Sequence, residues 1–397
     1  MDRLNSLQTT GFDYKSIKHW LIVAAITGLF FLLAGQGLLD SKSTYHKIFY
    51  FTFIPAALFG LGKKELSTAL KTPIISIFII FSLATILSTA INSSDEIPNL
   101  LKREAYTVAL FITICFLAKN AIDLTIKTVL AAATVFLVIS YYSFIPWIFS
   151  ILSSKNLGDR FIGAGMLDNP LLSSHLYGFY SVLLGLIAIY QKEKNIRLAS
   201  GGMALLFFIL TLATGSRTPL LALACTALWL PVISANKHAV KVLGGLAVAA
   251  VIAYLFYPEL FVNRGFSYRP ELWMSAIDQI KIYPVLGYGF GNNPDFFVES
   301  LQTSFREPHN IHLTVLYFTG ATGFIFWTAM HLAALLSCIK NKNDKLFIIA
   351  SCLLVYGIAA GMTEGGGLFP RPKEHWFITW IPLAFIAALQ YRKGILK

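Results

Sequence analysis

Residues 72–91, TPIISIFIIFSLATILSTAI, form a stretch of 20 residues without a charged side chain. An α-helix of that length rises about 30 Å, which matches the hydrocarbon core of a bilayer. Similar apolar stretches recur to the end of the chain, at about residues 18–38, 46–62, 103–118, 124–150, 172–190, 198–214, 218–234, 239–257, 311–338, 346–363 and 375–391. The sequence therefore predicts an all-α polytopic membrane protein with about 12 transmembrane helices, in which residues 1–397 form a single transmembrane domain.

The overall composition agrees with a membrane protein. The chain has 397 residues, of which 56% are hydrophobic and 13% are charged. Soluble proteins carry about 25% charged residues. The net charge of +12 would suit a nucleic-acid binder, but no soluble basic domain is present to carry that role. We therefore expect membrane lipids as partners and no nucleic acid.

Lysine and arginine are distributed differently between the two sets of alternating loops. If both termini are cytoplasmic, the inside loops hold 19 of the 32 Lys+Arg residues, as the positive-inside rule requires. The inside set contains 16 of 22 lysines, whereas the outside set contains 7 of 10 arginines. A planar guanidinium binds phosphate or carboxylate with two parallel hydrogen bonds. The outside arginines, which predict a site for an anionic lipid-linked substrate, are Arg103, Arg160, Arg217, Arg264, Arg269, Arg306 and Arg371.

The only loop long enough to fold is 258–310, an outside loop between the ninth and tenth predicted spans. Its first part predicts a short amphipathic helix, with Pro270 in the first turn and one apolar face formed by Leu272, Ala276, Ile277 and Ile280. A glycine-broken turn follows at 287–291. The triplet Asn293-Pro294-Asp295 has the residue types of a helix N-terminus. We therefore expect two short amphipathic helices lying on or over the membrane.

Two arginines begin helices on the outside. In GSRTP, residues 215–219, Thr218 can cap and Pro219 can start a span, so the free N–H groups and Arg217 together form an anion site. In SYRPE, residues 267–271, Arg269 begins the loop helix in the same way. The alternatives are an interfacial arginine reaching lipid headgroups for the first, and a solvated charge or an ion pair with Glu271 for the second.

The segment EPHNIH, residues 307–312, opens the tenth span. Pro308 at the first helical position would place His309 in the first turn, facing outside. There the helix dipole and nearby arginines disfavour the imidazolium form, and a neutral histidine suits a general base. The spacing of His309 and His312 also permits two metal ligands, but no third has convincing spacing. We expect no metal and a structural role for His312.

Two acidic residues are weaker candidates. Glu364 ends the eleventh span beside three consecutive glycines, and Asp168 lies just before Asn169-Pro170. Either carboxylate could orient an acceptor hydroxyl or pair with an arginine. For both residues the structural role is the favoured one.

Three of these segments, in this order, carry a resemblance to a known family. TGSRTP (214–219), RPELW (269–273) leading to PVLGYG (284–289), and PHNIHL (308–313) resemble the motifs of the O-antigen ligase/polymerase superfamily. The outside positions Asp159-Arg160 and Arg371 are similar to those of lipopolysaccharide O-antigen ligases. The resemblance covers roughly residues 155–375 by motif and the rest by the number of spans.

The resemblance implies a glycosyltransferase of the GT-C type of architecture, with residues 258–310 as a periplasmic loop. Its donor would be a glycan on undecaprenyl diphosphate in the bacterial inner membrane, and its acceptor a hydroxyl of the lipid A-core oligosaccharide. No metal or cofactor is implied. His309 would activate the acceptor hydroxyl, the diphosphate would be held by Arg217, Arg269 and Arg160, and further candidates for the site are Arg371, Glu364, Asn310 and Arg103.

Two alternatives stay open. A polymerase of the same superfamily would pass the glycan to another lipid-linked repeat and would need the same donor site. The ligase is favoured because the long loop, Asp159-Arg160 and Arg371 together are more ligase-like. A lipid-linked-glycan transporter is disfavoured, since the titratable groups gather outside rather than at mid-membrane and no similarity relates the two halves of the chain.

Overall fold

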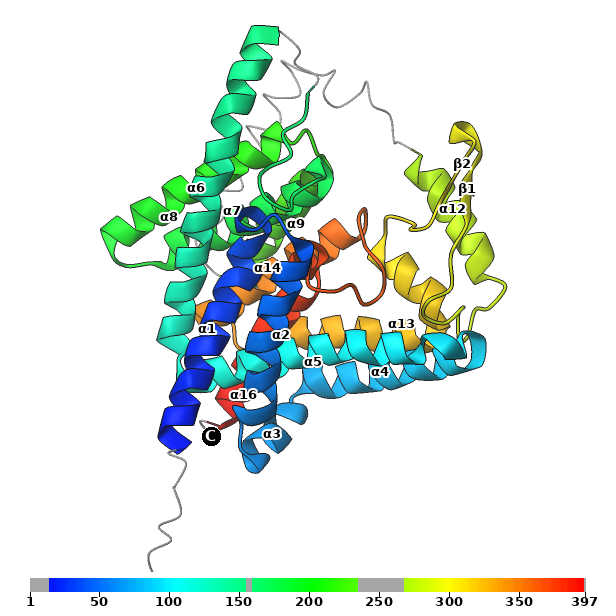
Figure 1. The fold of residues 1–397 in the computed structure, drawn as a ribbon, viewed down its shortest axis with the longest axis horizontal. Coiled ribbons are helices and arrows are strands. Elements are labelled where there is room, and N and C mark those ends of the chain that lie inside the picture. The colour runs from blue at the N-terminus through cyan, green and yellow to red at the C-terminus, as the bar shows by residue number, and fades with distance from the viewer. Residues whose placement is uncertain (1–13, 155–158, 235–267, 396–397) are drawn as a thin grey trace, which may run out of the picture.

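The computed structural model describes residues 14–154, 159–234 and 268–395. The elements in these ranges are almost all helical (Figure 1). In chain order they are α1 (Tyr14–Leu38), α2 (Lys42–Phe59), α3 (Lys63–Leu70), α4 (Pro73–Asn92), α5 (Ile97–Asn120), α6 (Ile122–Ser154), α7 (Pro170–Tyr190), α8 (Lys194–Ala213), α9 (Thr218–Ile233), α12 (Arg269–Ile280), β1 (Phe296–Val298), β2 (Thr303–Phe305), α13 (Ile311–Lys340), α14 (Lys345–Gly361), α15 (His375–Ile378) and α16 (Trp380–Ile395), with 3-10 turns at Ser94–Glu96 and Glu299–Leu301.

Helices cover every predicted span that lies within the described ranges, and the prediction of an all-α polytopic membrane protein is confirmed. Six helices there are long and apolar enough to cross a membrane: α1, α4, α6, α7, α8 and α13. Helices α9 and α14 are apolar but shorter. The predicted ninth span, 239–257, and the start of the loop at 258–267 lie outside the described residues.

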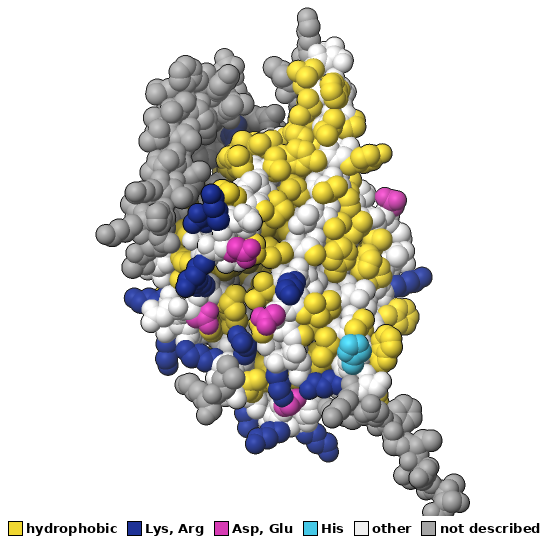
Figure 2. All heavy atoms as spheres, turned by 90° about the vertical axis from the view of Figure 1, so that its left-hand side faces the viewer, with side chains coloured by type: hydrophobic (Ala, Val, Ile, Leu, Met, Phe, Trp, Pro, Cys, Tyr) yellow, Lys and Arg dark blue, Asp and Glu magenta, His cyan; other side chains and the backbone are white. Residues whose placement is uncertain are grey.

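The surface of α6 shows why the bilayer is its solvent. Five large side chains spaced three or four residues apart on this helix are exposed by half or more: Val138 (65%), Tyr142 (83%), Ile145 (51%), Phe149 (64%) and Leu152 (67%). The view of this side of the molecule shows a broad hydrophobic area, with Lys and Arg side chains mainly toward its lower end (Figure 2). An apolar stripe of that length would be costly in water and is favourable against lipid.

Contacts between loops agree with the predicted assignment of alternate loops to opposite sides of the membrane. Lys42 and Asp168, both from predicted outside loops, form an ion pair at 2.7 Å. Arg103 donates from Nη1 to the carbonyl oxygen of Phe369 at 3.3 Å, which joins two further outside segments. At the other end of the bundle, Lys345 donates from Nζ to the carbonyl oxygen of Tyr190 at 3.0 Å. Segments assigned to one side of the membrane therefore meet one another.

The first of the two helices predicted in the loop is present, but the prediction of a second helix is wrong. Helix α12 buries Leu272, Ala276 and Ile280 against the strands and α13. In place of a second helix the chain forms the antiparallel hairpin β1–β2, in which Phe296 pairs with Phe305. The reason is the period of the apolar residues: Phe296 and Val298 alternate with exposed Phe297, a pattern that buries one face of a strand. The residue types of 293–295 suit a helix start, but no helical period follows them.

The glycine-rich turn inserts into a break in α13. Gly320 has φ 60° and interrupts the helix. Residues 284–289 fill the interruption, with backbone N–H groups of Tyr288 and Gly289 donating to the carbonyl oxygens of Tyr317 and Phe318 at 2.9 Å each. A Cβ on Gly287, whose φ is +68°, would lie 2.5 Å from backbone atoms of α13. The glycines therefore allow two backbones to touch and satisfy each other inside the bundle.

Candidate active site

Helix α12 positions an arginine and a tryptophan on one face. Arg269 is its first residue and Trp273 lies one turn later, so both side chains point the same way. The indole Nε1–H of Trp273 donates to the carbonyl oxygen of Pro308 at 3.0 Å. This bond ties the start of the loop helix to the peptide that precedes His309, which gives a physical reason for an R-x-x-x-W spacing.

The backbone of His309 differs from the expected one. Helix α13 begins at Ile311 with Asn310 as its N-cap, so His309 precedes the helix rather than lying in its first turn. The Asn310 side-chain oxygen accepts from the backbone N–H groups of His312 and Leu313 at 3.0 and 3.2 Å. His309 itself has φ 47°, one of two positive values at non-glycine positions in the described ranges. Such a conformation costs about 1–3 kcal/mol, and strain of this kind gathers at functional sites.

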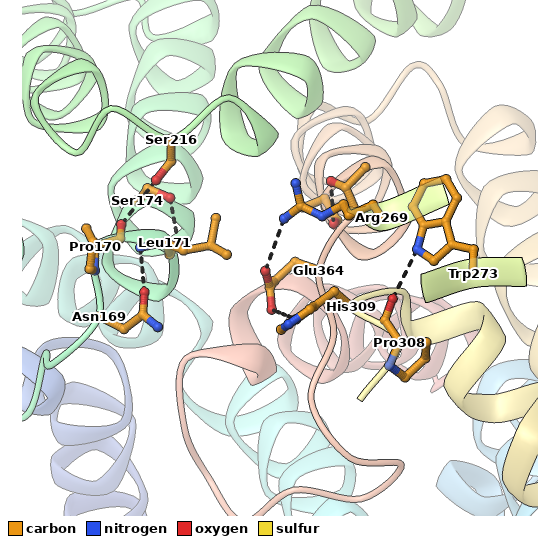
Figure 3. Close-up of polar contacts among 12 residues, drawn as sticks. Asn169, Pro170, Leu171, Ser174, Ser216, Arg269, Trp273, Pro308, His309 and Glu364 are labelled. Carbon is orange, nitrogen blue, oxygen red and sulfur yellow. Dashed lines mark hydrogen bonds and ion pairs between the residues drawn. The ribbon is translucent and has the colours of Figure 1, made fainter. Parts of the chain in front are cut away.

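Glu364 joins the arginine to the histidine. Its Oε1 lies 3.3 Å from Nδ1 of His309, and its Oε2 lies 3.8 Å from Nη2 of Arg269 (Figure 3). The Glu364 side chain is only 4% exposed, whereas those of Arg269 and His309 are about one-quarter exposed. Glu271, the alternative partner considered for Arg269, instead accepts from the backbone and hydroxyl of Ser300 at 2.9 and 2.6 Å. The carboxylate is thus the buried centre of the cluster.

The charge of Glu364 fixes the proton on His309. Burial alone would raise the pKa of Glu364, but the hydrogen bond from His309 and the attraction of His175, His309 and Arg269 outweigh it and lower that pKa below 4.5. An ionised carboxylate only accepts hydrogen bonds, so Nδ1 of His309 carries the proton. In a neutral ring, Nε2 is then the nitrogen with a free lone pair. The first-turn position that the helix-dipole argument assumed for His309 is wrong, because His309 precedes the helix. Glu364 orients the imidazole ring instead.

Several buried polar atoms around this cluster make no hydrogen bond within the described part of the chain. They include Nε of Arg269, Oε2 of Glu364 and both ring nitrogens of His175 and His375. Orphaned buried donors and acceptors are rare and require a ligand, water or strain. The sequence offered no signal for His175 or His375, because neither lies in a motif. Glu364 was considered, but its place at the centre depends on a contact across 55 residues.

Arg160 contacts the turn at 214–216. Its Nε donates to the carbonyl oxygen of Thr214 at 2.6 Å, and its Nη2 donates to the Ser216 hydroxyl at 2.7 Å. Arg160 therefore clamps the turn in which Gly215 has φ +60° and which leads to Arg217. Arg217 is exposed and occupies the N-cap position of α9, so Thr218 is the first helical residue rather than the cap. Figure 3 shows Ser216 of this turn apart from Glu364.

The remaining candidates separate from this cluster. His312 accepts from the Trp327 indole N–H at 3.1 Å, across the break in α13, which supports a structural role. Arg103 and Arg371 line a different cavity together with Asp168. No group of three or more His, Cys, Asp or Glu side chains suited to a metal ion occurs in the described ranges. Metal independence stays a prediction.

The fold and this site define a class of protein: a polytopic membrane protein with a histidine, a buried carboxylate and an arginine gathered beside a folded loop. The sequence model of a family described as O-Antigen ligase matches residues 202–328, which include Arg269 and His309. An O-antigen ligase from Pseudomonas aeruginosa is 36% identical over 391 residues, covering 94% of this chain and 92% of that protein. The chain belongs to the O-antigen ligase family, and its role is glycan transfer.

Proposed function

We propose that the protein is a glycosyltransferase that moves O-antigen glycan from undecaprenyl diphosphate to a hydroxyl of the lipid A-core oligosaccharide. The active face is periplasmic, in a bacterial inner membrane, and both termini are cytoplasmic. The observation that carries the proposal is the contact of Glu364 with both His309 and Arg269. This arrangement joins a base, its orienting group and a phosphate-binding side chain in one place.

The chemistry needs a base and stabilisation of the leaving group. The acceptor hydroxyl oxygen attacks the anomeric carbon of the donor sugar, and the bond from that carbon to the diphosphate oxygen breaks. Nε2 of His309 takes the hydroxyl proton, while Nδ1–H stays hydrogen-bonded to Glu364. The carboxylate then stabilises the imidazolium that forms, as the third group of a catalytic triad does. Undecaprenyl diphosphate leaves with the bonding electron pair.

Two arginines, Arg269 and Arg217, bind the diphosphate leaving group, and Arg160 supports them. Arg269 has a buried Nε without a hydrogen-bond partner in the described residues, so a diphosphate oxygen can satisfy it. Arg217, exposed at the N-terminus of α9, adds a second guanidinium and the N–H groups of the helix start. Arg160 supports them by holding the turn at 214–216. Guanidiniums stabilise the developing diphosphate charge without a metal.

Transfer by the purified protein tests the proposal. With lipid-linked glycan, lipid A-core acceptor and no ion gradient, glycan should move to the acceptor at an undiminished rate in excess EDTA. A requirement for a gradient would favour a transporter. Activity abolished by EDTA and restored by Mg²⁺ or Mn²⁺ would contradict the arginine mechanism.

The acceptor distinguishes a ligase from a polymerase. Both enzymes need the same donor site, and likeness to the Pseudomonas aeruginosa ligase over nearly the whole chain supports the ligase. Lipopolysaccharide of a deletion strain should lose all glycan-capped forms. Retention of forms capped with a single repeat would instead identify a polymerase.

A further inference from the structure

A second cavity lies apart from His309, with a volume of about 410 Å³. Its walls come from segments far apart in the sequence: the end of α1, the start of α2, α5, α7, Phe290 and the loop before α15. Four cationic side chains line it, namely Lys42, Arg103, Arg371 and Lys373. None of the residues of the His309–Glu364–Arg269 cluster lines it.

The charges in this cavity do not balance. Asp168 pairs with Lys42 at 2.7 Å. Burial raises the pKa of Glu374, which is 6% exposed, and the charge of Lys373 opposes that rise. Each lysine thus has a carboxylate near it, whereas neither Arg103 nor Arg371 makes an ion pair with any described residue. Two guanidiniums in one cavity repel each other, and an anion placed between them relieves that repulsion.

The cavity also has apolar walls and shares a lining residue with a smaller cavity. Tyr45, Leu172, Phe290 and Phe369 line it beside the cations, which suits a charged group attached to a lipid. Gly367 lines both this cavity and a smaller one of about 190 Å³ that includes Pro308, the residue before His309. A molecule lying along the loop at 364–374 would therefore extend from the base to the two arginines.

We propose that this cavity binds phosphate groups of the acceptor glycolipid and so orients the acceptor hydroxyl toward His309. That the ligand is the acceptor rests on the proposed function. That the cavity binds phosphate groups does not depend on it. The donor diphosphate belongs at Arg269 and Arg217, so a second anionic group on the other substrate accounts for a second arginine pair. Ordinary anionic phospholipid headgroups share this chemistry and are the alternative source.

Direct binding tests the proposal without any transfer step. The full chain is placed in nanodiscs of zwitterionic lipid, and its affinity is measured for phosphorylated lipid A-core and for the same glycolipid after enzymatic removal of its phosphates. Wild type should bind the phosphorylated form about tenfold or more tightly, and added salt should reduce the difference. The variant Arg103→Gln/Arg371→Gln should bind both forms with the same, weaker affinity.

Matched controls lie next to the cavity. Lys102 is adjacent to Arg103 on α5, and Lys47 is near His46 on α2; both are exposed and neither lines the cavity. Lys47→Gln/Lys102→Gln should keep the tenfold preference. Exposed Arg371→Gln alone, which poses little risk to folding, should lose part of it, and unchanged affinity for the lipid-linked donor verifies that each variant is folded.

Four outcomes would overturn the proposal. They are equal binding of the two glycolipids by wild type, an undiminished preference in Arg103→Gln/Arg371→Gln, loss of the preference in the lysine control, and competition by phosphatidylglycerol as effective as by the phosphorylated acceptor. The last would identify a general headgroup site. A protein that keeps the phosphate preference but transfers no glycan would contradict the proposed function and leave the phosphate site in place.

Discussion

The turn held by Arg160 and the cluster around Glu364 use arginine in opposite ways. Arg160 donates to a backbone carbonyl and a hydroxyl at 2.6 and 2.7 Å, so these contacts build the protein itself. Arg269 lies 3.8 Å from Glu364, beyond hydrogen-bond distance, and its buried Nε has no partner among the described residues. Arg160 thus hydrogen-bonds to its own chain, whereas Arg269 keeps a buried donor without a partner among the described residues.

The difference shows that charge on one face of the membrane is not evidence of one role. The same residue type at two predicted outside positions stabilises a turn in one case and, in our proposal, binds a substrate in the other. The sequence does not separate the two, but the contacts do: Nε and Nη2 of Arg160 donate to its own chain, whereas the buried Nε of Arg269 has no partner among the described residues.

The largest effect is expected at His309. His309→Ala removes the proton acceptor and should lower the transfer rate by about 10²–10⁴-fold, with little change in donor affinity. His312→Ala loses only the contact with Trp327 and should retain most of the activity of the folded protein. Turnover and donor affinity of both variants check this. A His309→Ala enzyme within a few-fold of wild type would exclude His309 as the base.

The next effect compares the two arginines. Lysine keeps the charge but loses the planar set of donors. Arg269→Lys should lower transfer by about 10²–10³-fold, as loss of a preorganised donor does, with normal thermal stability. Arg160→Lys should instead lower stability by about 1–3 kcal/mol, with a smaller effect on the rate at saturating donor. If both variants are equally inactive and equally stable, the assignment of different roles to Arg269 and Arg160 is contradicted.

A smaller effect is expected at Glu364. Glu364→Gln keeps the volume but removes the charge that orients His309, and should slow transfer by a smaller factor than His309→Ala, because the base itself remains. Because the pKa of Glu364 is lowered in the folded protein, its ion pairing stabilises the fold above pH 4.5 and is lost as the pH falls through the lowered pKa. Melting temperatures of wild type and variant should differ at neutral pH and converge as the pH falls below 4.5 and through the lowered pKa of Glu364.

The smallest effect on the chemistry concerns Gly287. Gly287→Ala forces a side chain into a backbone with φ +68°, 2.5 Å from atoms of α13, and should cost about 2–5 kcal/mol of stability. Gly202→Ala in α8, where no atom lies within 4 Å of the added Cβ, should be neutral or slightly stabilising. Thermal unfolding measures both. A fully stable Gly287→Ala would mean that the turn at 284–289 does not pack into the break in α13.

The membrane fold was predictable because each span is decided locally. Stretches such as 72–91 have no solvent other than lipid, so hydropathy alone locates their helices. The face of α12 formed by Leu272, Ala276 and Ile280 followed from its helical period in the same way. The hairpin was not predictable from residues 293–295, whose types suit a helix start, because the alternation of Phe296, Phe297 and Val298 decides the local structure.

The site was predictable residue by residue but not in its connections. Arg269 and His309 were chosen from their types and positions, yet the carboxylate between them comes from a loop after α14. The positive φ of His309 depends on tertiary packing that no local pattern encodes. Nor does spacing reveal that Arg160 donates to the turn at 214–216, since the hydrogen bond from its Nε to Thr214 joins residues 54 positions apart.

The coupling between His309 and Glu364 tests the central claim most directly. Single-turnover transfer is measured at saturating donor for wild type, His309→Ala, Glu364→Gln and the double variant. If Glu364 acts only by orienting the base, its substitution has no further effect once the base is gone, and the double variant should be as slow as His309→Ala alone. Two losses that multiply in the double variant would contradict the account, because Glu364 would then act independently of His309.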